Sequence, residues 1–124
     1  MSEIFKRYHW RICFRDGTET ATENPESATA WLRDPAVVDV ILIEHTCQQA
    51  TQQPGSVVVL SERGSLARVR AEVAGGYTLG WLNQLFANSD GERGNGIARM
   101  RLDNGALLDV GVVKMSVLPV TELP

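Results

Sequence analysis

The longest apolar run of the sequence is Val37-Val38-Asp39-Val40-Ile41-Leu42-Ile43. It is preceded by Asp34-Pro35 and followed by Glu44-His45. A run this short, and this rich in β-branched residues, favours a strand that is buried on both faces over a helix. We therefore expect residues 37–43 to form an interior strand that the other elements of the fold cover.

Length and composition predict a single globular domain over residues 1–124. The chain is 44% hydrophobic and 22% charged, which is close to the average of globular proteins. No apolar run approaches the roughly 20 residues that span a bilayer, and residues 1–7 lack the apolar core of a secretory signal. The two cysteines, Cys13 and Cys47, are too few for a disulfide framework. We expect a cytoplasmic protein that makes no contact with a membrane.

The charge balance argues against a global attraction to polyanions. The formal net charge is −3, so no overall basic field draws the chain to nucleic acid or to an anionic membrane. The basic residues are ten arginines and two lysines. Arginine suits planar, bidentate and stacking contacts better than lysine does.

The first half of the chain carries clear local signals. Residues 8–14 alternate between apolar and polar side chains, which predicts a strand. Asp16-Gly17 is a hairpin turn signal, and Thr18–Thr22 is the expected returning strand at an edge of the sheet. Asn24 as the N-cap and Pro25 in the first turn predict a helix that ends near Arg33.

The second half predicts two more hairpins and a second helix. Strands over 56–61 and 65–74 are expected to turn at Arg63-Gly64, and the polar stretch 46–55 reads as an exposed loop. Leu79, Leu82, Leu85 and Phe86 follow helical spacing, so we expect a helix that starts at Thr78. Residues 97–102 and 106–113 form the last expected hairpin.

These elements predict an α+β fold. Their order is ββαβ-ββα-ββ, and the expected architecture is a mainly antiparallel sheet with two helices packed on one face.

The histidines and cysteines do not predict a catalytic or metal site. On a strand, His9 and Cys13 would lie about 13 Å apart at ~3.3 Å per residue, whereas zinc ligands converge within ~2.0–2.3 Å of one ion. His45 and Cys47 could chelate together but lack two further ligands. A Cys–His nucleophile pair would need an oriented third group and a recognisable motif. We expect no metal and no cofactor.

Two polar segments are candidate contact sites. Asp16, Glu19 and Glu23 form an acidic patch that could dock against a basic surface. Residues 88–96 contain no apolar residue and read as a mobile contact loop with Asp90, Glu92 and Arg93. That loop lacks the Lys-Ser/Thr ending of a phosphate-binding loop, and Arg93 stands where a calcium-binding EF-hand needs glycine.

Arginines that alternate with apolar residues in the expected strands form a third candidate site. If two helices cover the apolar face of the sheet, these arginines project from the opposite face, where they could bind phosphates or carboxylates. The alternative is an ordinary solvated face with cross-strand pairs to Glu72, Asp103 or Asp109. The members of this predicted arginine face are Arg11, Arg68, Arg70, Arg99 and Arg101.

Three classes of function remain open from the sequence. We favour a non-enzymatic protein-binding module, for example a mobile-element inhibitor or adaptor that blocks a nucleic-acid-handling complex. The first alternative is an RNA- or DNA-binding domain that uses the arginine face, and the second is a small enzyme of unknown class. A homodimer through an edge strand, such as Thr18–Thr22 or the last strand, is a further possibility.

Overall fold

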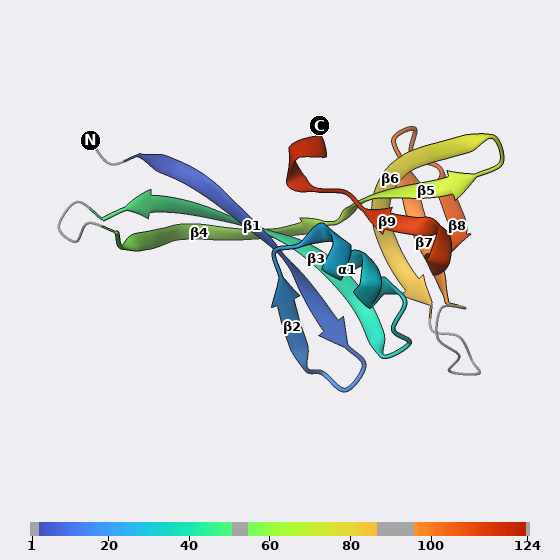
Figure 1. The fold of residues 1–124 in the computed structure, drawn as a ribbon, viewed down its shortest axis with the longest axis horizontal. Helices are drawn as coiled ribbons and strands as arrows, with labels where there is room; N and C mark the ends of the chain where they lie inside the picture. Colours follow the sequence, from blue (N-terminus) through green and yellow to red (C-terminus); the bar gives the residue numbers. More distant parts are fainter. Residues whose placement is uncertain (1–2, 51–54, 87–95, 124) are drawn as a thin grey trace.

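Two antiparallel sheets and one α-helix make up the described part of the chain, residues 3–50, 55–86 and 96–123 of a computed structural model (Figure 1). The predicted α+β class with mainly antiparallel pairing is confirmed. In chain order the elements are β1 (Ile4–Phe14), β2 (Glu19–Thr22), α1 (Pro25–Leu32), β3 (Val37–Gln49), β4 (Val57–Leu66), β5 (Arg68–Val73), β6 (Gly76–Phe86), β7 (Ile97–Leu102), β8 (Leu107–Gly111), η1 (Val112–Lys114), β9 (Met115–Val117) and η2 (Val120–Glu122).

The first sheet has the strand order β2-β1-β3-β4. The apolar run 37–43 begins β3, which lies between β1 and β4, so the predicted interior strand is confirmed. Val40 and Leu42 are buried on one face and Ile43 on the other, whereas Val38 is exposed. β3 also extends to Gln49, so residues 46–49 belong to a strand and not to the predicted loop.

Helix α1 forms where the capping signals predict it. The Asn24 side chain accepts a hydrogen bond from the Glu26 backbone N–H at 2.8 Å, and Pro25 occupies the first turn. This cap satisfies a backbone donor that would otherwise lack a partner at the helix start. Ala28 and Leu32 are buried against the sheets.

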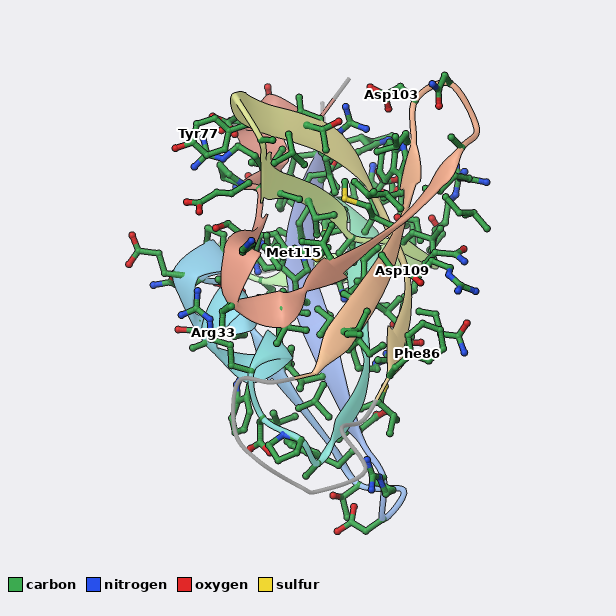
Figure 2. All side chains as sticks on the ribbon, turned by 90° about the vertical axis from the view of Figure 1, so that its right-hand side faces the viewer. Arg33, Tyr77, Phe86, Asp103, Asp109 and Met115 are labelled. Atoms are coloured by element: carbon green, nitrogen blue, oxygen red, sulfur yellow. The ribbon has the colours of Figure 1, made fainter. Side chains whose placement is uncertain are left out.

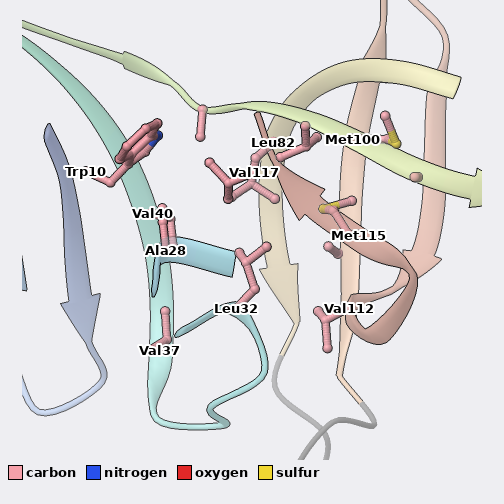
Figure 3. Packing of buried hydrophobic residues seen from close by; sticks show 14 of the residues in the cluster. Trp10, Ala28, Leu32, Val37, Val40, Leu82, Met100, Val112, Met115 and Val117 are labelled. Carbon is pink, nitrogen blue, oxygen red and sulfur yellow. The ribbon is translucent and has the colours of Figure 1, made fainter. Parts of the chain in front are cut away.

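The second sheet has the strand order β8-β7-β6-β5-β9, and β9 returns beside β5 after the short turn η1. One cluster of buried residues joins both sheets and the helix (Figure 3). Figure 3 shows Trp10 and Val40 of the first sheet, with Leu32 of α1, facing Leu82 and Met115 of the second. Each sheet therefore buries its apolar face against the other sheet and α1.

The predicted hairpin at Arg63-Gly64 is wrong. β4 runs in extended conformation through Gly64 and pairs with β3, and the chain then passes directly into β5 of the other sheet. A Cβ at Gly64 would make ordinary contacts with Ile41 and Ile43, at 3.4 and 3.5 Å. Gly64 is thus a glycine inside a strand and not a turn residue.

The predicted second helix is also wrong, because residues 76–86 form strand β6. A register shift between Leu82 and Gln84 marks a β-bulge that inserts Asn83. The extra residue places Leu82 and Leu85 on the same inner side although they are three positions apart. For this pair of residues the bulged strand reproduces the i, i+3 spacing of a helix, whereas Leu79 and Phe86 lie on the outer side of the sheet. The predicted order ββαβ-ββα-ββ fails at this element.

No helix among the described residues is long and apolar enough to cross a membrane.

Candidate interaction surface

Four of the five predicted arginines lie on the outer face of the second sheet. Directly paired residues of neighbouring strands share a face, and Arg68, Trp81 and Arg101 lie opposite one another across β5, β6 and β7. In Figure 2, the side chains of Phe86, Asp103 and Asp109 lie along one side of this sheet. We call the surface the arginine–aromatic face; its members are Arg68, Arg70, Glu72, Tyr77, Leu79, Trp81, Phe86, Arg99, Arg101, Asp103, Leu107 and Asp109.

These arginines point outward for a reason other than the predicted one. The expected second helix is absent from residues 76–86, so it cannot cover the apolar side of the sheet. The inward residues of β5, Val69 and Ala71, are instead fully buried in the core that the two sheets share. The side chains between them must then face outward, because successive residues of a strand alternate between faces.

Arg68 belongs to the structure of this face and is not available for a ligand. The residue is 5% exposed, and its guanidinium lies 4.9 Å from the centroid of the Trp81 ring. Nη1 and Nη2 donate hydrogen bonds to the Asp103 carboxylate at 2.5 and 2.9 Å. These bonds hold the pKa of Asp103 below its ordinary value and raise the pKa of Arg68. Both partners therefore stay charged.

Arg99 is held in the same way. Its Nε and Nη2 donate to the Asp109 carboxylate at 2.8 and 3.1 Å, and its guanidinium lies 5.1 Å from the Phe86 ring centroid. The hydrogen bonds from Arg99 lower the pKa of Asp109. The cross-strand carboxylate partners considered in the sequence analysis thus engage two of the four arginines.

Arg70 and Arg101 differ from Arg68 and Arg99 because they are exposed and have no ion pair among the described residues. The Arg70 guanidinium lies 4.7 Å from the ring centroid of Tyr77, which is itself 62% exposed. Leu79 and Leu107 are also exposed on this face, at 42% and 57%. The accessible part of the face therefore combines two charges with apolar side chains.

Arg11, the fifth predicted arginine, lies on the first sheet and does not join the others. Its Nη2 donates to the Glu62 carboxylate at 3.0 Å, and its Nε lies 3.8 Å from Glu19. The single arginine face predicted from the sequence is therefore divided between two sheets.

Beside Arg11, the structure brings together two histidines that the sequence analysis treated as separate. His45 Nε2 lies 3.2 Å from His9 Nδ1, and His45 Nδ1 lies 3.8 Å from Glu62. Burial, followed by the neighbouring His45 and Arg11, lowers the pKa of His9. Alternation placed His9 on a strand, but the predicted strand 37–43 ended before His45. The extension of β3 to Gln49 and its pairing with β1 make the two imidazoles neighbours.

The cysteines do not complete a site around this histidine pair. Cys47 is 1% exposed, and burial raises the pKa of the Cys13 thiol. Within the described ranges, no three His, Cys, Asp or Glu side chains are placed to hold one metal ion.

The predicted acidic patch is dispersed over the β1–β2 hairpin. Asp16 accepts hydrogen bonds from the backbone N–H and the hydroxyl of Thr18, which lower its pKa and secure the turn. Glu19 faces Arg11, and Glu23 is exposed. The predicted loop residues Asp90, Glu92 and Arg93 lie outside the described residues.

An open groove of about 630 Å³ lies beside the same hairpin. Its lining includes Phe14, Arg15 and Pro35, and the Arg15 guanidinium donates a hydrogen bond to the Pro35 carbonyl at 3.0 Å. Asp16 and Thr18 also line the groove, where the Thr18 hydroxyl donates to the Asp16 carboxylate at 2.6 Å as part of the turn.

No protein-family model matches the chain, and no curated protein or solved structure matches it either.

Proposed function

We propose that this protein is a protein-binding module that docks through the arginine–aromatic face of its second sheet. The observation that supports this most is the placement of Arg70 and Arg101 among the exposed side chains of Tyr77, Leu79 and Leu107. Arginine and tyrosine are enriched in the parts of protein interfaces that contribute most to binding.

The fixed residues of the face support the same reading. Arg68 on Trp81 and Arg99 on Phe86 are each held by a carboxylate with two hydrogen bonds. A surface that is already ordered loses less conformational entropy when a partner binds. The paired residues thus act as a rigid base for the exposed ones.

The charges indicate the chemistry of the partner. Four arginines share the face with three carboxylates, Glu72, Asp103 and Asp109. This small positive excess, next to apolar side chains, suits an apolar protein surface with a few carboxylates better than a polyanion. More specifically, we propose that the module is an inhibitor or adaptor that blocks a nucleic-acid-handling complex. It would act in the cytosol, where Cys13 and Cys47 remain thiols.

The test is a quantitative pull-down from lysate of the source cell with the wild-type chain and two double variants. Arg70→Glu/Arg101→Glu reverses the two exposed charges of the face. Arg7→Glu/Arg33→Glu makes the same charge change at exposed positions on β1 and at the end of α1. We expect a stoichiometric partner to be captured by the wild type and the control and lost from the first variant. Equal capture by all three would contradict docking through this face.

Direct binding of single-stranded nucleic acid is the second candidate, because three arginines each lie over an aromatic ring on one face. Bases stack on exposed aromatic rings, and arginines contact the phosphates between them. This function predicts an affinity for RNA or DNA that falls steeply with salt and is lost in Arg70→Glu/Arg101→Glu. A titration that shows no binding at low salt would exclude it.

A further inference from the structure

The two sheets end in four edge strands, β2 and β4 in the first sheet and β8 and β9 in the second. An edge strand presents a row of backbone N–H and C=O groups that can pair with another extended chain. Folded proteins protect such edges by shortness, charge, bulges or a covering element. The four edges of this protein differ sharply in that protection.

Three of the edges are protected. β2 has four residues and carries Glu19; it pairs only with residues 10–13 of β1, and the part of β1 that it leaves open carries the charges of Lys6 and Arg7. β9 has three residues and is covered by α1, because the Val117 backbone N–H donates to the Thr29 hydroxyl at 2.8 Å. β8 carries Asp109 near its centre. The edge strands named in the sequence analysis, Thr18–Thr22 and the last strand, are therefore poor sites for self-association.

The first four residues of β4, Val57–Leu60, lack this protection. Val58, Val59 and Leu60 are 50%, 55% and 50% exposed, and the segment contains no charge, proline or glycine. Within the described residues, β4 pairs with β3 on one side and has no strand on the other. Figure 1 shows this part of β4 projecting from the body of the molecule with the ends of β1 and β3.

The rest of β4 is protected. A register shift leaves Leu60 without a partner on β3, so a bulge twists the strand at this point. Glu62 and Arg63 follow within three residues of the bulge. The unprotected edge is thus confined to the apolar segment 57–60.

Both faces of the projecting end are apolar next to this edge. Val58, Gln48 and Ile4 lie in one cross-strand row, and Ile4 is 61% exposed. On the other face, Val59 lies in a row with Cys47 and Phe5. A strand added to β4 would therefore bury apolar side chains on both sides of the sheet.

We propose that a second copy of this chain occupies the edge, with the two β4 strands paired antiparallel across a twofold axis. The pairing joins two four-stranded sheets into one continuous sheet of eight strands. An uncharged apolar segment is complementary to itself, as an isologous contact requires. The contact lies on the first sheet and does not depend on the proposed function of the second.

The charges of β4 restrict the register of this pairing. A twofold axis at Glu62 or Arg63 would place like charges directly opposite each other, which is destabilising. An axis at residue 58, 59 or 60 places no charged residue of β4 opposite another. Because these three registers also bring the exposed apolar side chains of the two copies together, the pairing centres on the apolar segment.

The test is the mass of the intact chain in solution across the micromolar range, measured by light scattering after size-exclusion chromatography. We expect the wild type to approach twice the monomer mass of 13.6 kDa as concentration rises. Val59→Lys should remain a monomer, because it places a lysine in the pairing segment of each copy. Val113→Lys, at a 54% exposed residue of η1, is the matched control and should dimerise like the wild type.

Two results would overturn the proposal: a wild type that stays monomeric throughout, or a Val59→Lys variant that still dimerises. Circular dichroism reports whether Val59→Lys has folded. If it has not, amide hydrogen exchange of residues 57–60 in the wild type decides the question. Protection that rises with protein concentration supports the dimer. Protection that appears only when another protein is added assigns the edge to a different partner and contradicts self-pairing.

Discussion

The guanidinium of Arg68 donates hydrogen bonds to both carboxylate oxygens of Asp103, at 2.5 and 2.9 Å, while it lies over the ring of Trp81. The Arg68 side chain is 6% exposed, whereas that of Asp103 is 63% exposed. A buried charge on β5 is thus neutralised by a carboxylate just beyond the end of β7 that remains in contact with solvent. This contact fixes the position of Trp81 in the arginine–aromatic face.

Replacement of Arg68 should therefore affect stability, whereas replacement of Arg70 should affect binding. We expect Arg68→Ala to lower the free energy of unfolding by about 2 kcal/mol, because it removes a buried, hydrogen-bonded side chain. Arg70→Ala, at an exposed position of the same strand, should change it by less than about 0.5 kcal/mol. Urea denaturation of both variants measures the difference. A free energy of unfolding that falls as little in Arg68→Ala as in Arg70→Ala would show that Arg68 does not stabilise the fold.

Gly80 should not tolerate a side chain. A Cβ at this position would lie 2.5 Å from the Arg101 carbonyl oxygen and 2.7 Å from Met100 Cε. The backbone of β7 cannot move away without loss of pairing, so we expect Gly80→Ala to destabilise the fold by roughly 1–3 kcal/mol. Gly64→Ala, where the nearest atom lies at 3.4 Å, is the control and should be close to neutral. A tolerated Gly80→Ala would be inconsistent with the pairing of β6 with β7.

The histidine pair should make stability depend on pH near neutrality. Burial, His45 and Arg11 lower the pKa of His9, against a smaller opposing effect of Glu62. The folded protein then binds a proton at His9 less readily than the unfolded chain does, because histidine in an unfolded chain has a pKa of about 6.5. The free energy of unfolding is therefore greatest above that pH and falls as the pH drops through it. We expect urea denaturation at several pH values to show this slope and His9→Gln to reduce it; an unchanged slope would assign it to another group.

The two thiols should react slowly, which would argue against the alternative of a cysteine enzyme. Burial, with the nearby Asp39 and Glu19, raises the pKa of Cys13, and Cys47 is 1% exposed. The thiolate is the reactive form. We expect a thiol reagent at neutral pH to modify both more slowly than it modifies a model peptide, and to modify them readily in denaturant. A fast reaction in the folded protein would reopen the catalytic reading.

The correct parts of the sequence-based prediction are those that depend on local chemistry. Asp16-Gly17 forms the predicted turn, with Gly17 at a φ of 87°. Asn24 caps α1 as expected. Asn104-Gly105 lies between β7 and β8, again with a glycine at positive φ. In each case a few neighbouring residues determine the backbone conformation.

The errors arise where distant contacts override the local pattern. The bulge at Asn83 gave Leu82 and Leu85 the spacing of a helix, and a bulge depends on the partner strand as well as on its own residues. Gly64 read as a turn residue, but the pairing of β4 with β3 keeps it extended. The periodicity of a segment does not show which strand that segment will pair with, so neither β7 as the partner of β6 nor β3 as the partner of β4 could be predicted from it.

In the candidate site too, features set by the local sequence were predicted correctly and features set by long-range pairing were not. Alternation correctly placed Arg68 and Arg70 on one face of a strand and Val69 on the other. It could not assign Arg11 to a different sheet, because the division into two sheets depends on long-range pairing. It also could not reveal that Trp81 and Asp103 enclose Arg68, since both contacts cross to other strands.

The most direct test of docking through the arginine–aromatic face is hydroxyl-radical footprinting of the purified complex with the captured partner. Tyr77 on this face and Ile4 on the first sheet are exposed to nearly the same extent, at 62% and 61%. We predict that partner binding strongly reduces the oxidation of Tyr77 and Leu79 and leaves that of Ile4 unchanged. Oxidation of Tyr77 and Leu79 at the rate of the free protein, within an intact complex, would contradict the proposed binding surface.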